Sequence, residues 1–129
     1  GKNKMKIKVT RIMRGTERPI PNFELDTDLI ITYFPNWNGY DETLVFLKTF
    51  GNNPISIVET VEELEAKING TFKPTHFVVM RTYSNGFKEH KIYNLDQKSE
   101  AEKECNEKNK FGRWKFWIEP RILETKEVK

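Results

Sequence analysis

Residues 76–94, HFVVMRTYSNGFKEHKIYN, carry the clearest folding signal of the chain. Two stretches rich in β-branched and aromatic residues, His76–Tyr83 and Phe87–Asn94, flank the dipeptide Asn85-Gly86. Asn-Gly is typical of tight hairpin turns, because both central positions of such a turn need a positive φ. The segment therefore predicts an antiparallel β-hairpin.

A second hairpin is expected around Asn38-Gly39, a turn dipeptide of the same kind. It would pair Leu29–Phe34, another β-branched and aromatic stretch, with Thr43–Phe50. For the second stretch the sequence also permits a helix, which Asp41 would cap and Gly51 would end. We favour the hairpin, because Asn-Gly is the strongest short-range hairpin signal.

Toward the N-terminus, residues 4–14, KMKIKVTRIMR, alternate lysine with apolar side chains. This period of two is typical of a strand with one buried face. The alternation slips at Arg11–Ile12, which indicates a β-bulge. Residues 15–22 contain two prolines and a glycine and are expected to form a loop. A short strand is expected at Ile55–Glu59.

The first of two expected helices begins after Thr60. Glu63 follows three residues later, which is the spacing of a capping box, where each side chain accepts a hydrogen bond from the other residue's backbone. Apolar residues then recur on one helical face. Asn69-Gly70 is expected to end the helix, because glycine suits the left-handed position that follows a helix.

The second helix is expected to open with a capping box formed by Ser99 and Glu102, and to run to about Asn109. Its apolar face holds only Ala101 and Cys105. Such a narrow apolar face predicts that the helix lies close against a flat surface, which we expect to be the sheet.

The last expected strand is Arg113–Ile118, RWKFWI, whose alternation would point Trp114, Phe116 and Ile118 inward. Pro120 follows two residues later. Because proline has no backbone N–H to donate, it is expected to prevent a regular central strand beyond this point.

Together these elements predict an α+β fold, a mostly antiparallel β-sheet with two short helices on one face. The 129 residues are enough for one domain and too few for two ordinary ones, so we expect a single domain over residues 1–129. Its ordered core is expected at about residues 4–123, with a frayed tail at 124–129. The aromatic share of 12% argues against disorder, and no apolar run reaches the roughly 20 residues that a membrane-spanning helix needs.

The sequence contains no constellation that is typical of catalysis. Cys105 lies in mid-helix without a neighbouring base, so a nucleophilic role is not expected. For His76 and His90 we favour surface positions over a metal site. Three carboxylates alternate within residues 24–28 and could hold Mg²⁺ or Ca²⁺, but solvated side chains next to an edge strand explain them as well. We therefore expect no enzyme activity, no metal and no cofactor.

Trp37 and Tyr40 flank the Asn38-Gly39 turn, and exposed aromatic side chains at such a tip are typical anchors of protein interfaces. A cross-strand pair that only stiffens the hairpin is the alternative. The leading hypothesis is a small non-catalytic binding protein that inhibits or regulates another protein. A composition rich in Lys, Asn and Glu favours a phage or mobile-element origin, and a single cysteine without a signal peptide favours the cytoplasm.

Nucleic-acid binding is the alternative function. Residues 1–14 hold six of the 22 basic residues and no acidic one. Two rows of side chains would bind the nucleic acid, with Arg81 joining the second: Lys4, Lys6 and Lys8 on the first strand, and Arg113, Lys115 and Trp117 on the last. For the lysines, protection of a sheet edge against aggregation is the competing interpretation.

A third hypothesis is a domain that binds a small molecule or a nucleotide, with Arg81, Lys91, Arg113 and Tyr93 as its contacts. No glycine-rich phosphate loop accompanies these residues, because the seven glycines are scattered singly along the chain.

Overall fold

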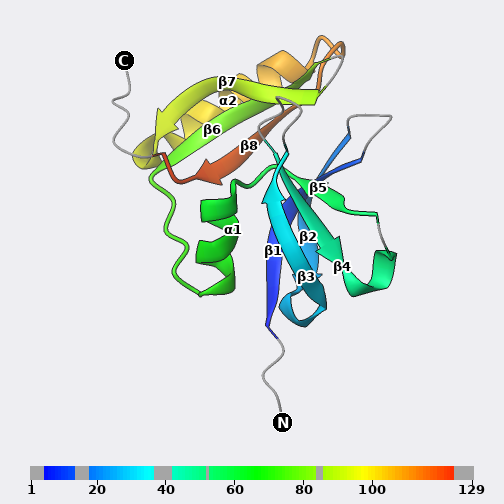
Figure 1. Ribbon diagram of the computed structural model, residues 1–129. Coiled ribbons are helices and arrows are strands. Elements are labelled where there is room, and N and C mark those ends of the chain that lie inside the picture. Colours follow the sequence, from blue (N-terminus) through cyan, green and yellow to red (C-terminus); the bar gives the residue numbers. More distant parts are fainter. Residues whose placement is uncertain (1–4, 14–17, 37–41, 52, 84–85, 124–129) are drawn as a thin grey trace. The chain divides into compact units, whose positions relative to one another are not determined.

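The computed structural model describes residues 5–13, 18–36, 42–51, 53–83 and 86–123 (Figure 1). The chain divides into two compact units, Gly1–Phe72 and Lys73–Lys129, and each is described by itself. Within the described residues every strand pair is antiparallel and two α-helices are present, so the α+β class is confirmed. The strands form two sheets where the sequence predicted one, and each unit has one helix. The single domain over residues 1–129 stays a prediction.

The first unit is a five-stranded sheet in the order β2-β1-β5-β4-β3. Its elements are β1 (Lys6–Met13), β2 (Arg18–Asp26), β3 (Ile30–Pro35), β4 (Thr43–Leu47), β5 (Ile55–Ile57) and the helix α1 (Val61–Ile68). Leu64 of α1 is fully buried and packs into one core cluster with Ile7, Val9, Val45 and Ile57 from three strands. The sheet and helix of this unit thus share one apolar core.

Strand β1 has the predicted alternation, with Lys6 and Lys8 exposed and Ile7 and Val9 buried. Its pairing with β2 shifts register at Thr10, so the predicted bulge is confirmed next to the point where the pattern slips. β1 lies between β2 and β5. β5 pairs with β1 only at Arg11 and Ile12, so among the described strands the segment with Lys6 and Lys8 pairs with β2 alone. The interpretation that these lysines guard a sheet edge stays a prediction.

The loop predicted for residues 15–22 is wrong from residue 18 onward, because those residues form the first half of β2. Pro19 lies opposite Ile12 of β1. β2 is an edge strand of the sheet, and an edge strand tolerates prolines because one side of its backbone needs no partner. Residues 15–17 lie outside the described part of the chain.

Strands β3 and β4 form the predicted antiparallel pair, with Ile30 opposite Leu47 and Pro35 opposite Thr43. The hairpin is confirmed over the described residues, and the alternative helix is wrong. Only a single 3-10 turn, Lys48–Phe50, follows β4.

Helix α1 begins and ends as predicted. Glu63 N donates to Thr60 Oγ1 at 3.1 Å, and Thr60 N donates to Glu63 Oε1 at 2.9 Å, so both halves of the capping box are formed. At the other end Gly70 has a φ of +72°, and Thr71 N donates to Ala66 O at 2.8 Å. These are the bonds of a left-handed helix stop.

The second unit is a three-stranded sheet in the order β7-β6-β8, with one helix on it (Figure 1). Its elements are β6 (His76–Tyr83), β7 (Gly86–Asn94), a 3-10 turn (Leu95–Gln97), α2 (Lys98–Asn109) and β8 (Phe116–Arg121). Ala101 of α2 is fully buried against Val79 and Tyr93. The predicted close packing of this helix on a sheet is confirmed. Neither helix of the described residues has the length and apolar character to cross a membrane.

The boundaries of two elements differ from their predictions. Gly86 pairs with Tyr83 and therefore belongs to β7, although the β6–β7 hairpin itself is confirmed. Ser99 lies inside α2 and does not cap it. The helical segment starts earlier, where the Gln97 side chain accepts a hydrogen bond from Asn94 N at 2.9 Å. An Asn–Gln pair thus supplies the helix start that Ser99 and Glu102 were expected to supply.

Strand β8 starts three residues later than predicted and continues through Pro120, which lies opposite Phe77. The strand thus continues beyond its expected end at Ile118. Because β8 is an edge strand, the expectation that Pro120 permits no regular central strand is confirmed. Phe116 and Ile118 pack against the core as predicted. Trp114 precedes the strand, so the alternation of β8 does not extend to it.

Candidate functional site

Two arginine side chains of the second unit lie over one indole ring. The guanidinium carbon of Arg81 is 5.0 Å from the centroid of the Trp114 ring, and that of Arg113 is 5.6 Å from it. Both distances fall within the roughly 6 Å range of cation–π interactions. These three residues are called the arginine–tryptophan cluster below. The structure thus brings together Arg81 and Arg113, two of the residues that the sequence assigned to one binding surface.

The cluster brings two positive charges close together on one ring. Among the described residues, neither Arg81 nor Arg113 has an aspartate or glutamate within ion-pair distance. Arg81 Nε donates to the backbone oxygen of Thr82 at 3.2 Å, which fixes the orientation of this guanidinium group. Because the two like charges held near one ring repel each other, an anion that pairs with both arginines would stabilise the arrangement.

The loop between α2 and β8, residues 110–115, is held at both ends. The Asn109 side chain pairs with the backbone of Phe116, accepting from its N at 2.9 Å and donating to its O at 3.0 Å. At the other end Lys115 N donates to Thr82 Oγ1 at 3.0 Å, and Thr82 N donates to Lys115 O at 2.9 Å. These bonds attach the loop to β6 and keep the cluster assembled.

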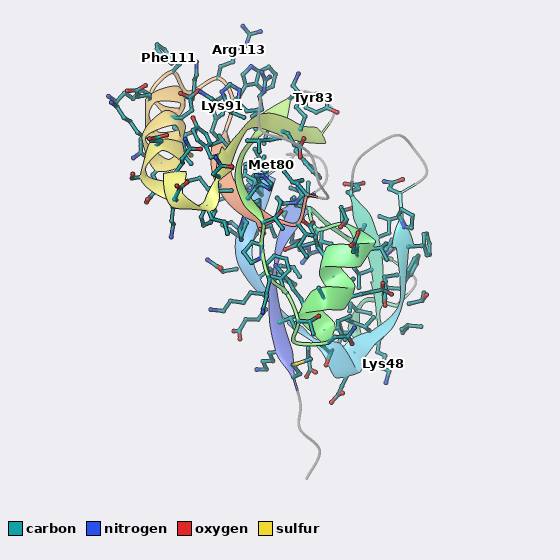
Figure 2. The ribbon with its side chains drawn as sticks, turned by 90° about the vertical axis from the view of Figure 1, so that its left-hand side faces the viewer. Lys48, Met80, Tyr83, Lys91, Phe111 and Arg113 are labelled. Atoms are coloured by element: carbon teal, nitrogen blue, oxygen red, sulfur yellow. The ribbon has the colours of Figure 1, made fainter. Side chains whose placement is uncertain are left out.

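Further cations and aromatic rings lie around the cluster. The Lys88 ammonium group is 5.7 Å from the centroid of the Tyr83 ring, and Lys88 lies opposite Arg81 in the sheet. Phe111, in the α2–β8 loop, is 82% exposed. Figure 2 shows Tyr83, Phe111 and Arg113 at the same end of the second unit. This end is therefore a surface of mixed cationic and aromatic character.

The predicted nucleic-acid-binding row also contained Lys115 and Trp117. Lys115 is exposed and follows Trp114 of the cluster in the chain, whereas Trp117 is not part of the cluster and lies within β8. Successive side chains of a strand point to opposite faces, so Trp117 points away from the face that carries Phe116. Its Nε1 donates to Glu119 Oε1 at 2.8 Å, and its ring meets the edge of Phe87 at a centroid distance of 6.4 Å. Trp117 is thus occupied by contacts within its own sheet.

The lysine row of β1 faces a row of carboxylates. Lys6 lies directly opposite Asp26, and Lys8 lies opposite Glu24. Opposite charges at such cross-strand positions attract each other, so this part of the sheet has little local net charge. The same register explains two of the three alternating carboxylates, Glu24 and Asp26, as neighbours of lysines. Lys4 lies outside the described residues.

The four residues of the small-molecule hypothesis do not form one pocket. Tyr93 is buried in the core beneath α2, and Lys91 lies over its ring at 5.2 Å. Arg81 and Arg113 form a second pair, in the arginine–tryptophan cluster.

The first unit has an open hollow of about 340 Å³, which Phe23, Leu29 and Leu47 line together with charged side chains of both signs. It contains none of the residues that the small-molecule hypothesis names. Its charged lining consists of one lysine, Lys6, and two carboxylates, Glu24 and Asp26.

Each histidine has a polar neighbour. His76 Nδ1 is 2.9 Å from Thr75 Oγ1, and His90 Nε2 is 2.9 Å from Glu104 Oε2. The hydrogen bond with His90 is the main cause that lowers the pKa of Glu104. Within the part of the chain that the structure describes, no three His, Cys, Asp or Glu side chains are grouped as a metal site.

Trp37 and Tyr40, the two proposed protein-interface anchors, lie outside the described residues. Binding of another protein through them stays a prediction.

Sequence reasoning missed Phe111 and assigned Trp114 to the core. The signal was present in residues 110–115, KFGRWK, where two aromatic residues alternate with three cations around a glycine. Because the prediction placed this segment in a strand, the alternation of its side chains put Trp114 on the inward face. In the loop after the end of α2, Phe111, Arg113 and Lys115 are exposed and Trp114 is half-buried.

Cys105 is expected to react slowly with iodoacetamide in the folded protein. Its Sγ donates to Phe116 O at 3.1 Å, and burial raises the pKa of the thiol, against a smaller opposite effect of Asn109. Little reactive thiolate is then present at neutral pH. We expect labelling of the native protein to be at least about 10-fold slower than labelling of the chain unfolded in urea. Equal rates in the two states would contradict the packing of α2 on its sheet.

No protein-family model, curated protein or solved structure matches this chain. Its function is therefore inferred from its own residues.

Proposed function

We propose that this protein is a non-catalytic nucleic-acid-binding protein that holds the phosphate backbone with the arginine–tryptophan cluster. One observation carries the proposal: Arg81 and Arg113 lie over the same ring without a carboxylate partner among the described residues. A guanidinium group can donate two parallel hydrogen bonds to one phosphate. We propose that it acts in the cytoplasm, in keeping with its single cysteine.

The surroundings of the cluster support a nucleic acid over a simple anion. Lys88 and Lys115 are exposed near it and could contact neighbouring phosphates. Exposed rings beside such cations are typical of surfaces that track a backbone and stack its bases. An acidic surface of another protein could also pair with the arginines, and the experiment below separates these two partners.

The double variant Arg81→Gln/Arg113→Gln is expected to weaken binding to mixed-sequence oligonucleotides by about 10-fold or more at low salt. Loss of two phosphate contacts also reduces the slope of log affinity against log salt by about 1.4–1.8. Fluorescence anisotropy of labelled oligonucleotides over a series of NaCl concentrations measures both quantities. Circular dichroism of the variant verifies that it folds.

The matched control is Lys6→Gln/Lys8→Gln, which removes the same charge from the first unit. Because these lysines already face Asp26 and Glu24, we expect their loss to change the affinity by less than about 3-fold. Equal losses in both variants would show that only net charge matters. If the unaltered protein binds no oligonucleotide even at low salt, the proposal is wrong and an acidic protein partner becomes the better candidate.

A further inference from the structure

We infer that the nucleic acid is single-stranded and that Phe111 is the platform on which one of its bases stacks. The inference rests on the proposed function and names its substrate class. Phe111 is 82% exposed, the highest exposure among the large apolar side chains of the described residues. An aromatic ring that the fold leaves in water, beside a cluster that favours an anion, has the chemistry to cover a base.

The backbone fixes where Phe111 projects. Phe111 N donates to Lys108 O and Gly112 N donates to Asn109 O, each at 3.3 Å, so the chain keeps turning after the end of α2. Gly112 has a φ of +70°, a conformation that glycine adopts without strain. The pairing of Asn109 with Phe116 closes the loop behind this turn. These bonds hold the backbone that carries the ring, so stacking of a base has to order the side chain and not the loop.

The phosphate-binding group and the ring come from the same loop. Arg113 follows Phe111 by two residues, and both side chains project from the same end of the unit (Figure 2). A nucleotide that places its phosphate at Arg113 thus has its base within reach of Phe111. Such alternation of cation and ring along a short segment fits a backbone with its bases turned outward.

A double helix does not expose the faces of its bases, which Phe111 would need for stacking. The faces of its bases are stacked on each other, and only their edges are accessible in the grooves. A phenylalanine at the tip of a loop reaches the face of an unpaired base directly, whereas in a duplex it must first force two stacked base pairs apart, which costs free energy. The exposed ring thus selects for a single strand, whereas the arginines alone select only for phosphate.

The test compares fluorescein-labelled oligonucleotides of about 12 nucleotides, in single-stranded and in duplex form, by fluorescence anisotropy. The unaltered protein is expected to bind the single strand more tightly. Phe111→Ala is expected to weaken single-strand binding by about 5- to 150-fold and to leave duplex binding within about 2-fold. Phe111→Tyr, which keeps an aromatic ring, is the matched control and is expected to retain most of the affinity.

The outcomes separate this inference from the proposed function. If Phe111→Ala binds the single strand as tightly as the unaltered protein while Arg81→Gln/Arg113→Gln does not, the base platform is wrong and the proposed function stands. Tighter binding of the duplex also overturns the single-strand inference alone. If neither form is bound, the inference and the proposed function both fail.

Discussion

Replacement of Lys67 by methionine is expected to lower the free energy of unfolding of the first unit by about 3 kcal/mol. Lys67 Nζ lies 2.8 Å from Glu59 Oε2, and the two side chains are only 16% and 4% exposed. Both oxygens of Glu59 also accept the backbone N–H of Thr10 at 3.1 Å, which holds the carboxylate in place inside the unit. Methionine keeps a long apolar stem but leaves this buried carboxylate without its cation, and such a loss is strongly destabilising.

Urea denaturation followed by far-UV circular dichroism measures this effect. The control is Lys48→Met, which removes the same charge from an exposed side chain of the same unit (Figure 2) and is expected to change stability by less than about 0.5 kcal/mol. A second variant, Glu59→Gln/Lys67→Met, removes both charges and is expected to recover part of the loss. Equal stability of Lys67→Met and Lys48→Met would contradict the buried ion pair.

The elements that the sequence predicted well have determinants within a few residues of each other. The capping box of α1 needs only Thr60 and Glu63, and Gly70 supplies the stop two positions after the helix. Pro19 misled the prediction because the effect of a proline depends on strand order, and Pro120 lies in a strand that continues past its expected end at Ile118. Both lie in edge strands, where a missing N–H costs little, and no local pattern reveals which strands are edges.

The sequence predicted the two arginines of the candidate site, but it did not predict that the aromatic residues Phe111 and Trp114 belong to the same surface. Arg81 and Arg113 were selected as cations, and the register that puts Arg81 opposite Phe116 brings the end of β6 close to the α2–β8 loop. The start of β8 was placed three residues early, so Trp114 was assigned to the core, whereas it precedes the strand and its ring lies against Arg81 and Arg113. Asn109 replaces a strand partner at that point by pairing with the backbone of Phe116. The pattern of apolar residues does not reveal that a side chain, here that of Asn109, forms the hydrogen bonds that a neighbouring strand would otherwise form.

Replacement of Ala101 by glutamate is expected to destabilise the second unit by about 3–5 kcal/mol and to abolish oligonucleotide binding. Ala101 is fully buried between α2 and its sheet, in a cluster with Val79 and Tyr93. A glutamate there has neither room nor a cation, so the unit must bury a charge or release the helix. Release of α2 also removes Asn109 from Phe116 and so frees the loop that carries Phe111. Stability and binding are therefore expected to fall together.

Asn106→Glu adds the same charge to an exposed position of the same helix, and its stability is expected to change by less than about 0.5 kcal/mol. Urea denaturation gives the stability of both variants, and amide hydrogen exchange locates the change. Faster exchange in Ala101→Glu is expected over α2 and at the start of β8, where Asn109 holds the strand. Exchange that rises only within α2, with binding retained, would mean that the loop keeps its shape without the helix. In that case Lys115 and Thr82 alone would hold the arginine–tryptophan cluster in place.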